Sequence, residues 1–164
     1  MRRIFVVLDS WFLIAILRKE SNSYAEAATD ILNCIRKAKQ SGKLKKLYIL
    51  WPIYYETLNT KTVKDRNSLQ RLRKFIREFH KELVNADDTL FREECLNRIK
   101  REEKVDLSLS GQVIGEFLLR IAEESPYEEF ILIIDDEGFS RFIRYWRKEN
   151  IKIVNACWKD IEIF

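Results

Sequence analysis

Glycine and proline are scarce in this chain, with four glycines and two prolines among 164 residues. Few positions therefore favour sharp turns or flexible linkers, and we expect mostly regular structure joined by short connections. The chain contains no repeat or low-complexity stretch, and its length suits one domain with a sizeable core. We therefore predict a single domain that spans residues 1–164.

Cysteine and histidine are also rare. The three cysteines, Cys34, Cys95 and Cys157, lie far apart without the spacing of metal ligands, so we expect free thiols in a reducing cytoplasm. The single histidine, His80, is expected on a helix face rather than as a ligand or base. No apolar run reaches the length of a membrane span, and Asp9 interrupts the first run, which argues against a signal peptide. We therefore expect a cytoplasmic protein without a membrane partner.

The apolar runs that are present predict buried strands. A composition of 46% hydrophobic and 34% charged residues is that of a globular protein rather than a disordered one. Apolar runs without alternation favour strands covered on both faces, and segments of helical periodicity separate them. Strands are expected at 4–8, 47–50, 130–134 and 151–154, and helices at 10–18, 23–40, 52–60, 63–80, 88–103, 109–124 and 138–149. This order predicts an α/β fold with three layers, in which helices flank a mostly parallel sheet of four to five strands.

Carboxylates follow these strands at their carboxyl ends. Asp9 follows the first strand, Asp135 and Asp136 follow the run at 130–134, and Glu56 lies on the helix after the second strand. Ligands of open parallel sheets bind beyond this edge, so three separate segments bring acids toward one place. Clustered carboxylates raise one another's pKa unless a cation lies between them. Mg²⁺ or Mn²⁺ suits such oxygen ligands, and a metal-bound water can attack a phosphodiester.

A structural interpretation of the same acids stays open. Asp9 and Asp136 each precede an expected helix and could be N-caps. Glu56 has no such role, and we expect its neighbours Tyr54 and Tyr55 to be partly buried. The four tryptophans are expected in the core or at an interface rather than in contact with bases.

The segment 61–80 is much more basic than the chain as a whole, whose net charge is +4. Its apolar residues Leu69, Leu72, Ile76 and Phe79 are spaced for one inward helix face, which leaves the basic residues outside. Basic surface attracts phosphate independently of sequence, although such a helix can equally be a solvated face. The candidate nucleic-acid-binding residues are Lys64, Arg71, Arg73, Lys74 and Arg77.

In this order and spacing the motifs resemble those of the PIN domain, a family of metal-dependent nucleases. "FVVLDSWFLIAIL" resembles the family's opening strand with its first acid, and "WPIYYETLN" resembles the motif in which a glutamate follows an apolar or aromatic pair. "LSLSGQVIGEFL" resembles the third motif, and "FILIIDDEGFSRF" the last. The family includes toxin ribonucleases of toxin–antitoxin pairs and RNA-processing enzymes, and the resemblance covers nearly the whole chain.

The resemblance implies a ribonuclease whose catalytic acids are Asp9, Glu56 and Asp136, holding Mg²⁺ or Mn²⁺ with Asp135 adjacent. It also implies that Ser10 helps to hold the first acid. The family's third acid is missing, because Gly111 occupies its position. RNA is the implied substrate, and the family also suggests a homodimer, through the helix at 10–18, and an antitoxin or other protein partner.

Two alternatives remain. The gap at Gly111 is compatible with a domain that binds RNA or a protein without cleaving. A phosphohydrolase with an aspartate nucleophile, or a phospho-acceptor receiver, would also place acids at the sheet edge. The phosphohydrolase usually needs a second aspartate where Trp11 stands, and the receiver needs an acidic pair before its first helix, so neither fits well.

Overall fold

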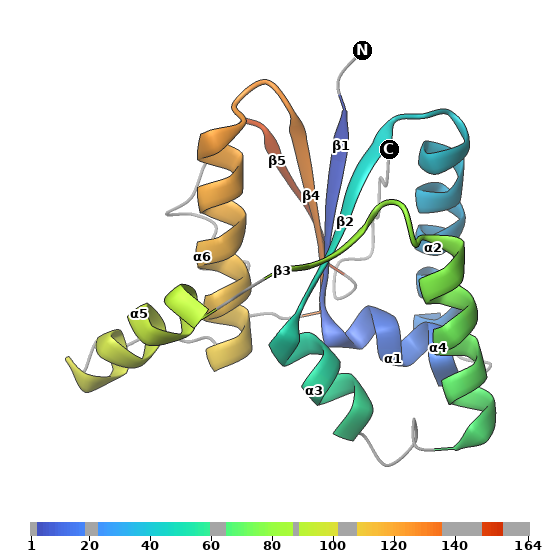
Figure 1. Cartoon of the computed structure of the whole chain (residues 1–164), viewed down its shortest axis with the longest axis horizontal. Coiled ribbons are helices and arrows are strands. Elements are labelled where there is room, and N and C mark those ends of the chain that lie inside the picture. The colour runs from blue at the N-terminus through green and yellow to red at the C-terminus, as the bar shows by residue number, and fades with distance from the viewer. Residues whose placement is uncertain are drawn as a thin grey trace.

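The centre of the fold is a single five-stranded sheet. The structure, a computed structural model, describes residues 3–18, 23–59, 65–86, 89–101, 108–135 and 149–155. The strand order is β3-β2-β1-β4-β5, and every neighbouring pair is parallel (Figure 1). The strands are β1 (Ile4–Leu8), β2 (Leu44–Leu50), β3 (Leu83–Ala86), β4 (Glu129–Ile134) and β5 (Ile151–Asn155). This arrangement confirms the predicted α/β class with a parallel sheet.

Helices cover both faces of the sheet. They are α1 (Ser10–Arg18), α2 (Ser23–Gln40), α3 (Trp51–Asn59), α4 (Arg66–Glu78), α5 (Thr89–Lys100) and α6 (Leu109–Glu124). Helices α5 and α6 lie on one side of the sheet, and α1, α2 and α4 lie on the other (Figure 1). Helix α3 follows β2 directly at the carboxyl edge, next to α1. The predicted three layers are therefore confirmed.

The strand at 83–86 was not predicted, and the second strand was predicted too short. β3 is an edge strand of four residues with a polar Asn85 in it, so it lacks the long apolar run that marked the other strands. β2 begins at Leu44 rather than at 47. The prediction missed its first residues because Lys45 and Lys46 interrupt the apolar run. The helix predicted at 138–149 falls on residues that lie outside the described ranges, except for 149, which is in a turn.

The buried face of α4 is only partly the one predicted. Leu72 and Phe79 are buried as predicted, whereas Leu69 and Ile76 are exposed. Ser68 and Phe75 are buried in their place, and Leu72 packs against Leu17 of α1. Two large apolar side chains of α4 therefore face solvent beside its arginines.

The rare residues lie largely where the sequence predicted. Cys95 is buried and Cys34 is partly buried, and both are free thiols, whereas Cys157 lies outside the described residues. His80 is exposed just after the end of α4, with its Nδ1 3.0 Å from the carbonyl oxygen of Arg77. Within the described ranges, none of the helices combines the length and the apolarity that crossing a membrane would require.

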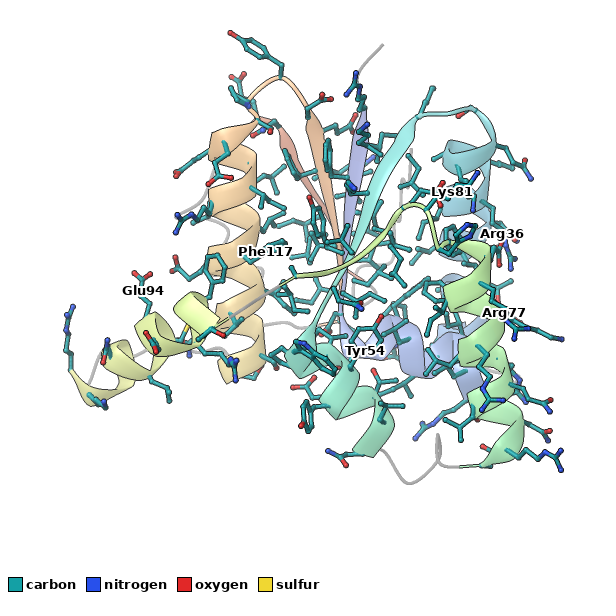
Figure 2. All side chains as sticks on the ribbon, viewed as in Figure 1. Arg36, Tyr54, Arg77, Lys81, Glu94 and Phe117 are labelled. Atoms are coloured by element: carbon teal, nitrogen blue, oxygen red, sulfur yellow. The ribbon has the colours of Figure 1, made fainter. Side chains whose placement is uncertain are left out.

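One layer of the core consists of aromatic rings between the sheet and α6. Phe5 of β1 stacks on Phe130 of β4 with ring centroids 4.9 Å apart. Tyr48 of β2 contacts Phe117 of α6 edge-on at 5.2 Å, and Phe117 in turn contacts Phe91 of α5 at 5.7 Å. Phe117 therefore joins α5 and α6 to the sheet (Figure 2). The side chains on this face of β1 point toward α6.

Candidate active site

Asp9 lies at the carboxyl end of the central strand. Its backbone amide donates a hydrogen bond of 3.0 Å to the carbonyl oxygen of Ile133, so the β1–β4 ladder continues through this residue. The side chain is half-buried, and the hydroxyl of Ser10 donates to its Oδ1 at 3.4 Å. Because α1 begins at Ser10, Asp9 occupies the position that both the N-cap and the site interpretation require. The hydroxyl of Ser10 therefore lies beside the carboxylate of Asp9.

The alternation of β1 places Asp9 on the side of α6. Side chains two residues apart on a strand share a face, so Asp9 follows Phe5 and Val7. Phe5 belongs to the aromatic layer beneath α6. The chain enters α6 at the same edge of the sheet at which it leaves β1 (Figure 1). Asp9 and the first turn of α6 therefore lie at the same edge of the sheet.

Glu56 lies on α3 at the same edge. Its side chain is exposed and lines a hollow of about 440 Å³ between α3, α5 and α6. The residues around this hollow are Trp51, Pro52, Tyr55, Glu56, Arg92, Ser110 and Val113. Glu56 therefore opens toward the start of α6, where the resemblance implies the third acid.

Gly111 is buried in the first turn of α6. Ser108 caps this helix, and its Oγ accepts a hydrogen bond of 3.1 Å from the amide of Gly111, which makes Gly111 the third helical residue. Residues three and seven positions later on the same helix face, Ile114 and Leu118, are fully buried. Position 111 therefore lies on the buried face of α6 at the carboxyl edge of the sheet, and glycine places no side chain there.

Asp135 lies away from Glu56. The odd-numbered neighbours of β4, Ile131 and Ile133, face away from α6, and Asp135 continues that side. It lines a separate hollow of about 240 Å³ with Trp11 and Tyr24, on the side of α1 and α2. Asp136 is outside the described residues, so its part in the site stays a prediction.

The described acids do not form a complete metal site by themselves. No group of three or more histidine, cysteine, aspartate or glutamate side chains is close enough to hold an ion within the described ranges. Asp9, Glu56 and Asp135 are all among those residues, so a site at this edge needs a further donor such as Asp136. The structure thus places Asp9 and Glu56 at one edge of the sheet and Asp135 toward another hollow.

The basic helix α4 is only partly the free surface that the sequence predicted. Arg73, Lys74 and Arg77 are exposed, and Lys64 lies outside the described residues. Arg71 is half-buried, and its Nη1 donates to the carbonyl oxygen of Leu17 in the last turn of α1. The expectation that all arginines lie on the outer face is therefore wrong for Arg71, because a cation near a helix C-terminus binds its unpaired carbonyls.

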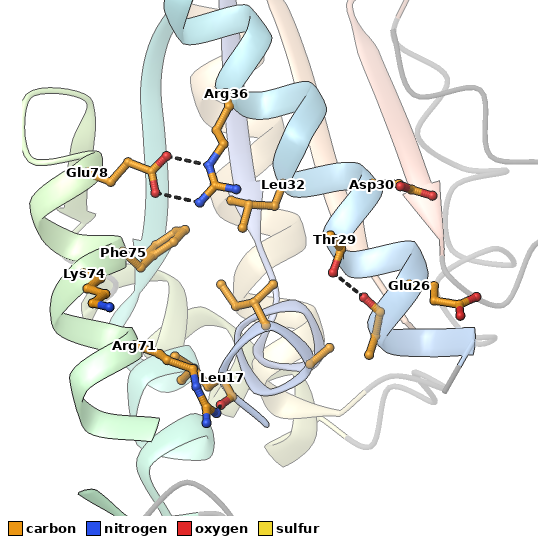
Figure 3. A pocket seen from close by; sticks show the side chains of 13 residues that line it. Leu17, Glu26, Thr29, Asp30, Leu32, Arg36, Arg71, Lys74, Phe75 and Glu78 are labelled. Carbon is orange, nitrogen blue, oxygen red and sulfur yellow. Dashed lines mark hydrogen bonds and ion pairs between the residues drawn. The ribbon is translucent and has the colours of Figure 1, made fainter. Parts of the chain in front are cut away.

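A larger groove lies between α1, α2 and α4. It has a volume of about 860 Å³ and an apolar floor that includes Leu17, Leu32 and Phe75 (Figure 3). Arg36 of α2 donates to both carboxylate oxygens of Glu78 on α4, at 2.6 and 2.9 Å, and this pair spans the groove. The sequence did not reveal this groove, because the pair joins residues 42 positions apart.

We expect Glu78→Gln to remove a pH-dependent part of the stability. The hydrogen bonds from Arg36 hold the pKa of Glu78 below its usual value, although partial burial opposes this. Because the folded-state pKa is lowered, the stabilisation is present above the unfolded pKa of about 4.3 and is lost as the pH falls through the folded pKa. Arg36 and Glu78 are 41% and 34% exposed, so solvent screening limits the effect at pH 7 to about 0.5 kcal/mol.

Urea unfolding at pH 7 and near pH 3 would measure this effect. The difference in unfolding free energy between the wild type and Glu78→Gln should shrink at the lower pH. A difference of equal size at both pH values would contradict the role of this ion pair.

The sequence interpretation missed the exposed aromatic residues beside Glu56. Trp51 and Tyr55 are 53% and 66% exposed, so Trp51 does not lie in the core and the expected partial burial is wrong for Tyr55. Tyr54 is buried, more fully than the expected partial burial. Three aromatic residues lie within this nine-residue helix, and their spacing alone does not show which of them faces the core.

Comparison with known proteins identifies no family by sequence. No family model matches the chain, and no curated protein matches it significantly. The chain is similar to a chain in a solved structure, with a TM-score of 0.49 and 16% sequence identity. That structure is the crystal structure of VapBC2 from Rickettsia felis, bound to a DNA fragment from the VapBC2 promoter. The match covers 94% of this chain and 99% of that chain.

Proposed function

We propose that this protein is a metal-dependent ribonuclease of the PIN type. The observation that supports the proposal is that Asp9, Glu56 and the first turn of α6 all lie at the carboxyl edge of a parallel sheet, where Glu56 and Ser110 line one hollow. Three motifs quoted from the sequence lie on these three segments, and open parallel sheets bind their ligands at this edge. The proposed catalytic acids are Asp9, Glu56 and Asp136.

The donor set suits a hard divalent cation. Carboxylate oxygens from Asp9 and Glu56 favour Mg²⁺ or Mn²⁺ over softer metals. We assign Asp136 as a further ligand, with Asp135 adjacent to it in the chain. A bound ion of this kind would supply an ionised water for attack on the phosphodiester and neutralise charge on the phosphate. The chain's own part is to orient the acids, as the hydroxyl of Ser10 does for Asp9.

The alternative proposal is binding without cleavage. It is favoured by one observation, the lack of an acid at the buried Gly111 in the first turn of α6. In that case the chain would bind RNA, or a protein partner such as an antitoxin, through the same fold. The homodimer and the cytoplasmic location also stay predictions.

Incubation with a labelled single-stranded RNA separates these two functions. The ribonuclease should cleave with Mn²⁺ or Mg²⁺, and EDTA should stop the cleavage. RNA that is bound but never cut under any of these conditions would support the alternative. The response of a variant without the Asp9 carboxylate is the decisive control.

RNA binding should depend on the exposed cations of α4. We expect the double variant Arg73→Glu, Arg77→Glu to bind RNA more weakly and to lower the slope of log K against log salt by at least about 1.4. This value follows from about 0.7 per phosphate contact on single strands. Arg71 is left in place because its contact with Leu17 supports α1. Fluorescence anisotropy over a series of salt concentrations measures both quantities.

The matched control changes the same charge elsewhere. Lys43 and Lys45 are exposed at the amino edge of the sheet, so Lys43→Glu, Lys45→Glu should leave the slope nearly unchanged. If both double variants lose affinity equally, binding depends on net charge, and α4 has no specific role.

A further inference from the structure

We propose that Trp51 and Tyr55 form a stacking platform for unpaired bases of the RNA substrate, with Arg92 contacting a neighbouring phosphate. The inference rests on the proposed ribonuclease function and names its substrate as single-stranded RNA. It gives exposed side chains of α3 and α5 a role in substrate binding that is separate from the role of the candidate acids.

The platform consists of large aromatic side chains on the surface beside a candidate catalytic acid. Trp51 is 53% exposed and Tyr55 is 66% exposed, and both line the hollow that contains Glu56. Leu58, one turn further along α3, is also exposed. Leaving such side chains in water is unfavourable, and a cluster of them on one helix face marks a binding surface.

Contacts within α3 hold the tryptophan in place. Its ring contacts the ring of Tyr54 edge-on at 5.9 Å and the ring of Tyr55 at 6.2 Å. Tyr54 is buried, and its hydroxyl donates a hydrogen bond of 2.9 Å to Oδ1 of Asn85 on β3 (Figure 2). Trp51 is therefore supported on one side by an anchored ring while about half of its surface stays accessible. A preorganised ring loses little conformational entropy when a base stacks on it.

The charge beside the platform favours a nucleic acid over an apolar peptide. Arg92 is exposed on α5 and lines the same hollow as Trp51 and Glu56. A guanidinium can bind a phosphate with two hydrogen bonds and can also stack on a base. Aromatic faces combined with cations are the usual means of binding single strands.

The platform requires unpaired bases. In an RNA duplex the base faces are stacked on one another, and proteins contact mainly the backbone and the shallow groove. Trp51 and Tyr55 can therefore contribute only where a base is free to leave its stack. We expect single-stranded RNA to be preferred over a duplex of the same length.

The test measures binding without cleavage. A fluorescein-labelled RNA of about 12 nucleotides, within the usual site size, is titrated with the full chain in EDTA and followed by anisotropy. Trp51→Ala and Tyr55→Ala should each weaken binding by about five- to tenfold, while the salt slope should not change. Trp51→Phe should stay within about twofold of the wild type, because it keeps an aromatic face. Arg92→Ala should weaken binding and lower the salt slope by about 0.7.

The matched control is Tyr127→Ala. Tyr127 is 88% exposed in the turn before β4, at the opposite edge of the sheet, and its removal should not change RNA affinity. Thermal unfolding of each variant checks that the fold is intact. If Trp51→Ala does not fold, Tyr55→Ala still tests the platform, because the Tyr55 side chain is mostly exposed and its removal should not affect folding.

The outcomes separate this inference from the ribonuclease function. Unchanged affinity in folded Trp51→Ala and Tyr55→Ala would overturn the platform, even if the protein cleaves RNA. Equal affinity for the duplex would overturn it as well. Loss of single-strand binding in both variants would support the platform, even if the wild type fails to cleave RNA with any metal.

Discussion

Asp9→Asn is expected to lower metal-dependent cleavage of RNA by at least about 100-fold. Asparagine keeps the shape of the side chain and its contact with Ser10, but it removes the negative charge that a divalent cation requires. Changes in groups that only orient a metal ligand already cost about 10- to 100-fold, so the loss of a ligand should cost more. Initial cleavage rates of a labelled single-stranded RNA in Mn²⁺ measure the effect.

Metal binding gives a second measurement that does not depend on cleavage. A ligand that binds only the folded state raises its stability, so Mn²⁺ should raise the unfolding temperature of the wild type. It should do so much less for Asp9→Asn. Asp30→Asn is the matched control, because Asp30 is an exposed aspartate on α2. Equal cleavage by wild type and Asp9→Asn would exclude Asp9 as a catalytic acid and leave it as a helix cap.

Gly111→Asp should raise metal-dependent cleavage by at least about tenfold. Position 111 lies in the first turn of α6, on the helix face that includes the buried Ile114 and Leu118. A carboxylate there would point to the edge where Asp9 and Glu56 lie and would add the acid that the PIN resemblance implies. Groups that orient a metal ligand are worth about 10- to 100-fold in activity or affinity. A further ligand should therefore raise the cleavage rate by at least about tenfold.

Helix chemistry supports this substitution. An acid near the N-terminus of a helix interacts favourably with the helix dipole, and glycine is a poor helix former. Because position 111 is buried, the ionised carboxylate also requires the bound cation as its partner. Gly111→Asn is the control, because it introduces nearly the same volume without the charge. If a folded Gly111→Asp variant neither binds Mn²⁺ more tightly nor cleaves faster than Gly111→Asn, position 111 is not part of the site.

The main elements could be predicted from local patterns because their apolar residues repeat along the chain. The run at 4–8 and the helix at 23–40 have the predicted bounds, since each shows one uninterrupted periodicity. β3 could not be predicted, because four residues with a polar Asn85 carry too weak a pattern. The prediction of the buried face of α4 was wrong for Leu69 and Ile76, because that face depends on how α4 packs against α1.

The candidate site was predictable only as far as chain position allowed. Parallel strands end at one edge, so Asp9 and Glu56 could be placed there from the order of the elements alone. Which side of the edge each acid faces depends on the register between strands. That register places Asp135 by another hollow, with Trp11 and Tyr24.

The sequence by itself determined the α/β class, the parallel strands and the position of each acid relative to its own strand. These properties depend on residues that are close together in the chain, where periodicity and turn chemistry act directly. Only the tertiary structure decided the strand order β3-β2-β1-β4-β5, the contact of Arg71 with Leu17 and the exposure of Trp51. Each of these depends on which distant segments pack together, and that is set by the burial of the whole core rather than by any local pattern.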